Sequence, residues 1–173
     1  MQRHHQTKVD RHPHVFGDVA VSGSGEVLQN WEELKRKEKH QETAADSVDS
    51  VARSLPGLWR AEKIQKKARK AGFDWPDVSG ALDKLSEEVE ELRTAVAEGS
   101  NIQEELGDLL FAAVNVSRFV QVDPEDALSG ACDKFARRFR QVEQSAAERG
   151  QALEHMTLAE MDKLWDAVKE HEA

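Results

Sequence analysis

The sequence lacks several features that mark secreted, membrane and nucleic-acid-binding proteins. Its single cysteine, Cys132, excludes an intrachain disulfide and fits a reducing compartment. The longest apolar run, residues 109–114, is far too short to cross a bilayer, and the polar N-terminal residues do not resemble a signal peptide. The net charge of −9 disfavours a nucleic-acid backbone as partner, because that needs clustered Lys and Arg. We therefore expect a cytoplasmic protein that binds neither a membrane nor a nucleic-acid polymer; a phosphorylated small molecule remains compatible with this charge.

No segment shows the alternating pattern of a β-strand, and the composition, 39% hydrophobic with 33% charged residues, fits a helical protein with one core. Cap signals include Pro56, Gly72, a Ser100–Gln103 capping box, Asp123 with Pro124, and a Thr157–Glu160 capping box. The expected helices cover residues 26–41, 55–71, 79–98, 100 to before 123, 124–149 and 157–171. The sequence predicts an all-α protein, with a compact antiparallel four-helix bundle from about 55 to 149 and flanking helices.

The expected domain organisation has three parts. Residues 1–24 are predicted to be an irregular tail, because their histidines follow no helical or strand spacing that would organise a metal site. Residues 25–54 are expected to form a helix and a small, polar linker, and residues 55–171 the main domain. Apolar stripes are expected to form its core. They comprise Leu82, Leu85, Val89, Leu92 and Val96, then the wide arc of Ile102, Leu106, Leu109, Leu110, Ala112, Ala113, Val116, Phe119 and Val120, then Leu128, Cys132, Phe135, Phe139 and Val142, then Leu158, Met161, Trp165 and Val168.

Two acidic pairs stand out between Lys84 and Asp108. Glu88 with Glu91, and Glu105 with Asp108, are each three residues apart, so each pair lies on one helical face. If the chain folds back at Gly99, four carboxylates converge on one point, as a hard cation such as Mg²⁺ requires. The alternative is a solvated acidic face. We favour the metal site because Glu105 falls inside the apolar arc of its helix and Asp108 at its edge, and a buried carboxylate is costly unless it is paired or binds a metal.

These residues resemble those of a known family. Residues 87–91 (EEVEE) followed by residues 105–108 (ELGD) match the EExxE…ExxD signature of MazG-type nucleoside triphosphate pyrophosphohydrolases. The likeness extends to residues 58–65 (LWRAEKIQ), 72–75 (GFDW), 107–114 and 134–140 (KFARRFR), and together covers most of residues 55–170. It is closest to the second domain of bacterial MazG. Because residues 12–18 resemble the end of a first such domain, we expect a MazG that lacks its N-terminal domain.

The resemblance implies a role for each candidate site residue. It assigns Mg²⁺, with Mn²⁺ as an alternative, to Glu88, Glu91, Glu105 and Asp108. It places Lys134 and Arg138 on the triphosphate, although spacing alone left these two undecided between exposed and functional residues. Lys84, Glu87 and Glu104 would line the nucleotide site, and Trp165, which its stripe marks first as a packing residue, would contact the nucleotide. Two departures from the family pattern, Cys132 in place of Asn and Asn101 in place of Lys, put contacts to sugar or phosphate in doubt.

The expected reaction is Mg²⁺-dependent hydrolysis of a nucleoside triphosphate to the monophosphate and pyrophosphate. The metal would activate a water that attacks the α-phosphorus, with Glu87 as a candidate base and Lys134 and Arg138 neutralising the departing pyrophosphate. The resemblance also implies a homodimer, because members of this family work as dimers. Two alternatives remain open: a narrower pyrophosphatase for dUTP, dCTP or an oxidised dNTP, and a non-catalytic helical interaction module with a vestigial metal site.

Overall fold

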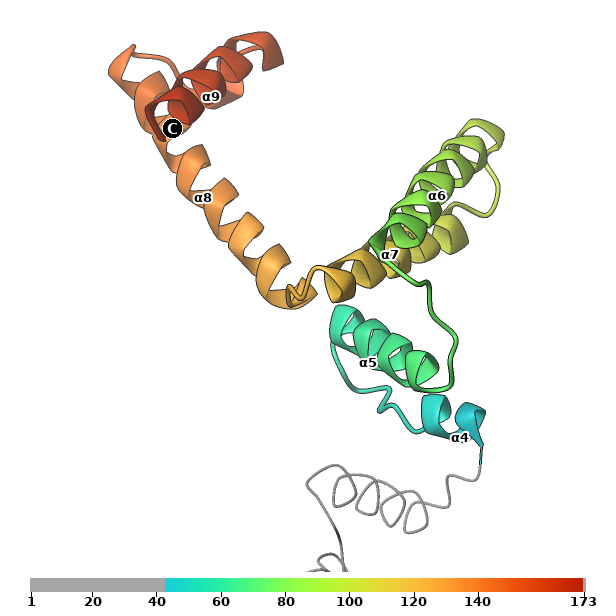
Figure 1. The fold of residues 1–173 in the computed structure, drawn as a ribbon. Helices are drawn as coiled ribbons and strands as arrows, with labels where there is room; N and C mark the ends of the chain where they lie inside the picture. Colours follow the sequence, from blue (N-terminus) through green and yellow to red (C-terminus); the bar gives the residue numbers. More distant parts are fainter. Residues whose placement is uncertain (1–42, 173) are drawn as a thin grey trace, which may run out of the picture. The chain divides into compact units, whose positions relative to one another are not determined.

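The computed structural model describes residues 43–172, so the tail and the first helix expected before residue 42 lie outside the described residues. The described part contains helices and no strand, which confirms the all-α prediction (Figure 1). Its elements are α4 (Ala44–Asp49), α5 (Gly57–Lys70), α6 (Val78–Glu98), α7 (Ile102–Phe119), α8 (Pro124–Glu148), the 3-10 helix η1 (Leu153–His155) and α9 (Leu158–Glu172). None of these helices is both long enough and apolar enough to span a membrane.

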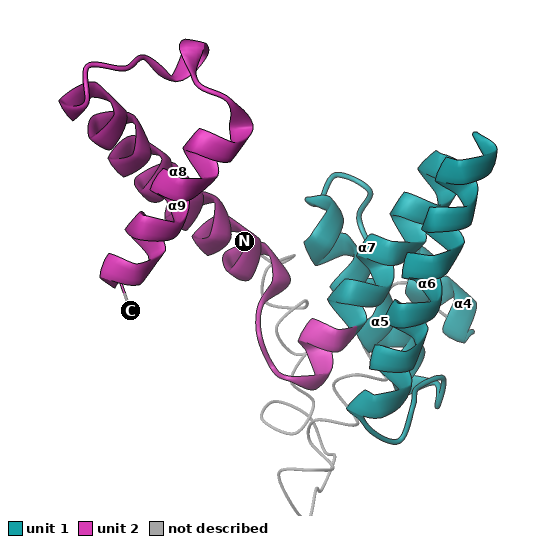
Figure 2. Ribbon diagram, turned by 90° about the horizontal axis from the view of Figure 1, so that it is seen from above, with its two compact units in different colours: residues 1–115 teal, residues 116–173 magenta. Residues whose placement is uncertain are grey.

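The chain divides into two compact units, residues 1–115 and 116–173, and each is described by itself (Figure 2). The expected four-helix arrangement remains a prediction. The expected linker over residues 42–54 contains a helix, α4, which begins with a capping box between Thr43 and Asp46. Helix α4 packs on α5, where the Lys67 ammonium donates to the hydroxyls of Ser47 and Ser50 at 3.0 and 3.1 Å. Helix α4 was not predicted because most of its residues are small or polar.

Helix α6 is fixed at both ends by local chemistry. The Asp77 carboxylate caps its start by accepting from the Ser79 backbone N–H at 2.8 Å. The Trp75 indole lies so close to Gly80 that a Cβ there would overlap the ring, so α6 needs glycine at this position. The helix ends at Gly99, whose φ of 68° is the left-handed conformation that glycine adopts readily. The predicted break at Gly99 is therefore confirmed, and it allows α7 to return beside α6 (Figure 1).

The capping box predicted for Ser100 and Gln103 is wrong. With Ser100 as cap, Asn101 would have to be the first helical residue, but its φ of 54° is left-handed and α7 begins at Ile102. The Ser100 hydroxyl instead contacts the Glu98 carboxylate at 3.5 Å. Asparagine is one of the few residues enriched in this conformation, which gives a backbone reason for its presence at position 101.

The second unit is held together by packing between α8 and α9. Its core contains Val142, Ala146, Leu164 and Val168, with Leu153, Met156 and Trp165 packed against it. The predicted Thr157–Glu160 capping box is confirmed, because the Glu160 carboxylate accepts from the Thr157 backbone N–H at 2.8 Å and the Thr157 hydroxyl accepts from the Glu160 N–H at 3.4 Å. Leu164, the most deeply buried leucine, was absent from the predicted stripe of α9, and Leu158 was wrongly included because it is 71% exposed.

Much of the predicted apolar core is exposed within its own unit. Of the predicted stripe on α8, only Val142 is buried; Leu128, Cys132, Phe135 and Phe139 are exposed, because α9 covers α8 near its C-terminal end. In the first unit, six predicted core residues of α6 and α7 are likewise exposed. We call them the uncovered apolar set: Leu82, Val89, Val96, Ile102, Leu106 and Leu110. The predicted stripes are correct as helical faces, but the assignment of these residues to a closed core is wrong for each unit taken alone.

Candidate active site

Three carboxylates from α6 and α7 converge in the first unit. One oxygen from each of Glu88, Glu105 and Asp108 lies within 4.8 Å of the others. Glu88 comes from α6 and the other two from α7, so the reversal at Gly99 is what brings them together. Three carboxylate oxygens at this spacing form a donor set that a hard divalent cation prefers.

Glu88 is the buried member of the group. It is 5% exposed, its Oε1 lies 2.9 Å from the Lys84 ammonium, and its Oε2 has no hydrogen-bond partner. A buried carboxylate oxygen without a partner is costly, and a cation held among the three carboxylates would satisfy it. The residues present therefore fit a divalent metal ion.

The sequence predicted burial for the wrong carboxylates. Glu105 is only partly buried and Asp108 is exposed. The prediction assumed that the apolar arc of α7 is covered, whereas its Leu106 and Leu110 are 45% and 50% exposed. Glu88, which lies beside the apolar stripe of α6, is buried instead.

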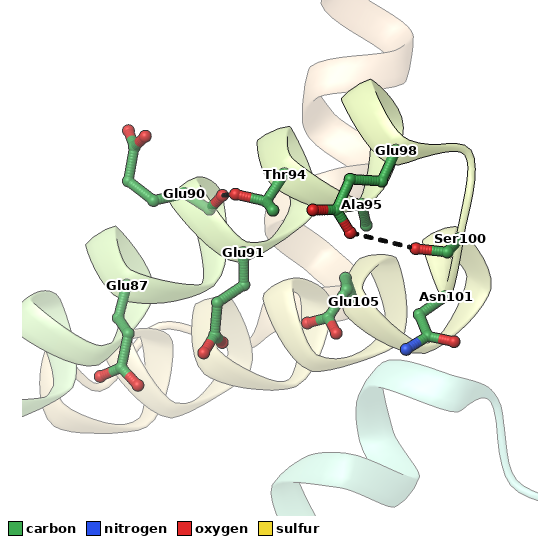
Figure 3. Close-up of a pocket in the computed structure, with 9 residues that line it drawn as sticks. All are labelled: Glu87, Glu90, Glu91, Thr94, Ala95, Glu98, Ser100, Asn101 and Glu105. Carbon is green, nitrogen blue, oxygen red and sulfur yellow. Dashed lines mark hydrogen bonds between the residues drawn. The ribbon is translucent and has the colours of Figure 1, made fainter.

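Glu91, the fourth predicted ligand, lies just outside the converging group. It lines an open pocket of about 350 Å³ whose walls come from α6, the Gly99 turn and α7 (Figure 3). The pocket is lined by Glu87, Glu90, Glu91, Thr94, Ala95, Glu98, Ser100, Asn101 and Glu105. Desolvation raises the pKa of the Glu91 carboxyl above its ordinary value; the nearby Lys84 lowers it, and the charges of Glu88, Glu87 and Glu105 raise it further. Excess negative charge therefore accumulates beside the three converging carboxylates.

Lys84 is the cation within this acidic group. Its ammonium lies 2.8 Å from Glu87 Oε1, 2.9 Å from Glu88 Oε1 and 3.9 Å from Glu91 Oε2. Hydrogen bonds to Glu87 and then to Glu88 raise the pKa of Lys84 well above its ordinary value, so it remains charged. The Glu87 side chain is 56% exposed, and one of its oxygens is paired with the Lys84 ammonium. Glu104 is an exposed residue in the first turn of α7.

The remaining predicted residues belong to the second unit. Lys134 is exposed on α8. The Arg138 guanidinium donates from Nε to Glu172 Oε2 at 2.7 Å, and its Cζ lies 6.0 Å from the Trp165 ring centre. Trp165 packs on the α8–α9 core and lies 5.1 Å from the Phe135 ring, as expected of a packing residue.

Sequence reasoning missed two polar residues. Gln65 is 6% exposed; its Nε2 donates to the Phe111 carbonyl at 2.8 Å and its Oε1 has no partner. Glu172 binds both Arg137 and Arg138. Gln65 was detectable in principle as a polar residue on the inner side of a helix, whereas nothing in the spacing of Glu172 singles it out among the acidic residues of α9.

The described part of the chain is thus all-α, and two of its helices bring together three carboxylates that could hold a divalent cation. Residues 77–143 match the MazG nucleotide pyrophosphohydrolase domain. This match contains all four predicted metal ligands together with Lys134 and Arg138. Residues 77–143 are therefore a MazG-type domain within this chain.

Similar proteins agree with this assignment. The chain is 43% identical over 166 residues to the nucleoside triphosphate pyrophosphohydrolase of Escherichia coli, covering 94% of this chain and 63% of that protein. It is 38% identical over 161 residues to the Thermotoga maritima nucleoside triphosphate pyrophosphohydrolase/pyrophosphatase MazG, covering 93% and 61%. It is 49% identical over 167 residues to the Bacillus subtilis uncharacterized protein YabN, covering 95% and 34%. The chain thus spans less than two thirds of the length of these relatives.

Proposed function

We propose that this chain is a cytoplasmic enzyme that hydrolyses nucleoside triphosphates to the monophosphate and pyrophosphate with the help of Mg²⁺. The observation that carries the proposal is the buried, unpartnered oxygen of Glu88 among three converging carboxylates. The names of the Escherichia coli and Thermotoga maritima relatives supply the reaction class.

Glu88, Glu105 and Asp108 would hold the metal ion, with Glu91 as a fourth ligand from the adjoining turn of α6. When bound, Mg²⁺ supplies Lewis-acid polarisation of the α-phosphate and lowers the pKa of a coordinated water. One oxygen from each of Glu88, Glu105 and Asp108 already lies within 4.8 Å of the others, so these residues would need little rearrangement to bind the cation.

The other predicted residues would act on the substrate itself. Lys134 and Arg138 would neutralise the negative charge of the departing pyrophosphate. Glu87, exposed and beside the pocket, would accept the proton of the attacking water. Lys84 and Glu104 would line the nucleotide site, and Trp165 would contact the nucleotide.

The test is hydrolysis of a panel of ribo- and deoxyribonucleoside triphosphates in ¹⁸O-labelled water, with and without Mg²⁺. We expect pyrophosphate and monophosphate as the only products, with the label in the monophosphate because water attacks the α-phosphorus. Label in the pyrophosphate would contradict attack at the α-phosphorus, and release of orthophosphate would contradict the reaction. A single strongly preferred nucleotide would indicate the narrower pyrophosphatase, and no turnover by the folded chain would favour the interaction module.

We also propose that the chain forms a homodimer in which the uncovered apolar set is buried. Exposed contiguous apolar surface on a protein of this size favours association. Val96, 60% exposed on α6, is the most exposed member of the set. In sedimentation velocity we expect the wild type to be a dimer and Val96→Glu to dissociate at least roughly tenfold more readily, because an unpaired carboxylate would be buried.

The matched control for this dimer test is Ala97→Glu, which adds the same charge at the exposed neighbouring position. This variant should remain dimeric. A monomeric wild type at micromolar concentration, or equal dissociation of the two variants, would contradict a dimer through this surface.

A further inference from the structure

Two neighbouring arginines on α8 share one carboxylate from the last turn of α9. Arg137 Nε lies 3.1 Å from Glu172 Oε1, and Arg138 Nε lies 2.7 Å from Glu172 Oε2. Adjacent residues on a helix are about 100° apart and do not normally face each other. Glu172 is therefore the group that draws both guanidinium groups toward one point.

The surroundings of this carboxylate are basic and open. Arg137, Arg138, Lys169 and Glu172 line a pocket of about 360 Å³ on the second unit. The Lys169 ammonium is paired with Asp166 at 2.9 Å. Hydrogen bonds from Arg138 and then from Arg137 lower the pKa of the Glu172 carboxyl, so it is an anion at neutral pH. The pocket thus already binds one anionic group with two arginines.

We propose that Arg137 and Arg138 form a paired-arginine site for the pyrophosphoryl part of the substrate, and that Glu172 occupies this site until the substrate displaces it. That the anion is the pyrophosphoryl part of the substrate rests on the proposed function. Arg138 already belongs to the proposed pyrophosphate site, and Arg137 and Glu172 are its new members. A pyrophosphoryl group carries more charge and more acceptor oxygens than a carboxylate, so it competes well for two guanidinium groups.

The competing explanation is that Glu172 only fastens α9 to α8. The two explanations differ in what happens when the charge of Glu172 is removed. A fastening residue leaves anion affinity unchanged or lowers it, because the arginines lose their positioning. A competitor raises anion affinity, because the arginines no longer have to give up a bound carboxylate.

The experiment is calorimetric titration of the whole chain with inorganic pyrophosphate, in chelator to remove divalent metal. Glu172→Gln should bind pyrophosphate about three- to tenfold more tightly, and Arg137→Gln about three- to tenfold more weakly, as exposed charge networks allow. Two controls remove the same charges nearby. Glu170→Gln on α9 and Arg140→Gln on α8 are exposed and line no part of this pocket, so each should stay within about twofold of the wild type. Circular dichroism would verify that every variant is folded.

Unchanged or weaker binding by folded Glu172→Gln would overturn the competitor assignment, and unchanged binding by Arg137→Gln would overturn the paired site. Nucleotide hydrolysis by the wild type is measured separately. If the wild type hydrolyses nucleotides but Glu172→Gln binds pyrophosphate no more tightly, the proposed function stands and this inference fails. If Glu172→Gln binds more tightly and the wild type has no turnover, the anion site stands and the proposed function fails.

Discussion

Glu88→Gln is expected to abolish nearly all metal-dependent turnover without weakening the fold. Glu88 is the buried carboxylate of the converging group, and its Oε2 has no hydrogen-bond partner. Glutamine keeps the side-chain shape but removes the charge that binds the cation. Loss of Lewis-acid assistance worth several kcal/mol corresponds to roughly a thousandfold lower rate.

The stability of the same variant separates a metal ligand from a structural carboxylate. A buried charge with an unsatisfied oxygen opposes folding, so the neutral amide should leave the metal-free chain as stable as the wild type or more so. Lys84 loses Glu88 as a charged partner but retains Glu87. In urea unfolding we expect Mg²⁺ to raise the midpoint of the wild type and to leave that of Glu88→Gln almost unchanged.

The control is Asp83→Asn, which removes one exposed charge from the same helix. It should retain turnover and the Mg²⁺-dependent shift of the urea midpoint. Substantial turnover by Glu88→Gln, or marked destabilisation without metal, would show that Glu88 has a structural rather than a metal-binding role.

The fold could be predicted as far as local chemistry determines it. Gly99, Asp123 and the Thr157–Glu160 pair each act on their own helix end, and the observed boundaries follow them. Asn101 shows the limit: its left-handed backbone moves the first helical residue of α7 from Asn101 to Ile102, and the cap pattern at Ser100 did not indicate this. Which residues of an apolar stripe are covered by another helix was less predictable. Phe135 and Phe139 lie on a correct apolar stripe, but a stripe does not state whether another helix or a second chain covers it.

In the candidate site, too, local helix geometry could be predicted and packing between helices could not. Spacing and the break at Gly99 predicted that four carboxylates of the two helices would meet, and the structure brings together three of them, Glu88, Glu105 and Asp108. Which of them is buried depends on packing between helices, and Glu88 rather than Glu105 took that position. Glu172 was invisible because its partners, Arg137 and Arg138, are 35 and 34 residues away along the chain.

Lys84→Met is expected to tighten Mg²⁺ binding while lowering turnover. The Lys84 ammonium contacts Glu88, one of the three converging carboxylates, at 2.9 Å. A metal ion must compete with this internal cation and tolerate its charge nearby. Methionine keeps the length of the side chain and removes both effects, so we expect roughly three- to fivefold tighter Mg²⁺ binding in a calorimetric titration, as a small ion-pair network allows. Turnover should fall because Lys84 is also a proposed substrate contact.

Lys84→Met is informative because Mg²⁺ binding should become tighter while turnover falls. Without metal, Lys84→Met should unfold at a lower urea concentration than the wild type, because Glu87, Glu88 and Glu91 then repel one another without a neutralising cation. Added Mg²⁺ should reduce this difference, since binding stabilises the variant more than the wild type. Lys66→Met is the matched control: it removes an ammonium paired with Glu62 at 2.6 Å on α5 and should leave Mg²⁺ affinity unaltered. Weaker Mg²⁺ binding by Lys84→Met would contradict this prediction. It would mean that Lys84 supports the metal site and does not compete with the metal ion for the carboxylates.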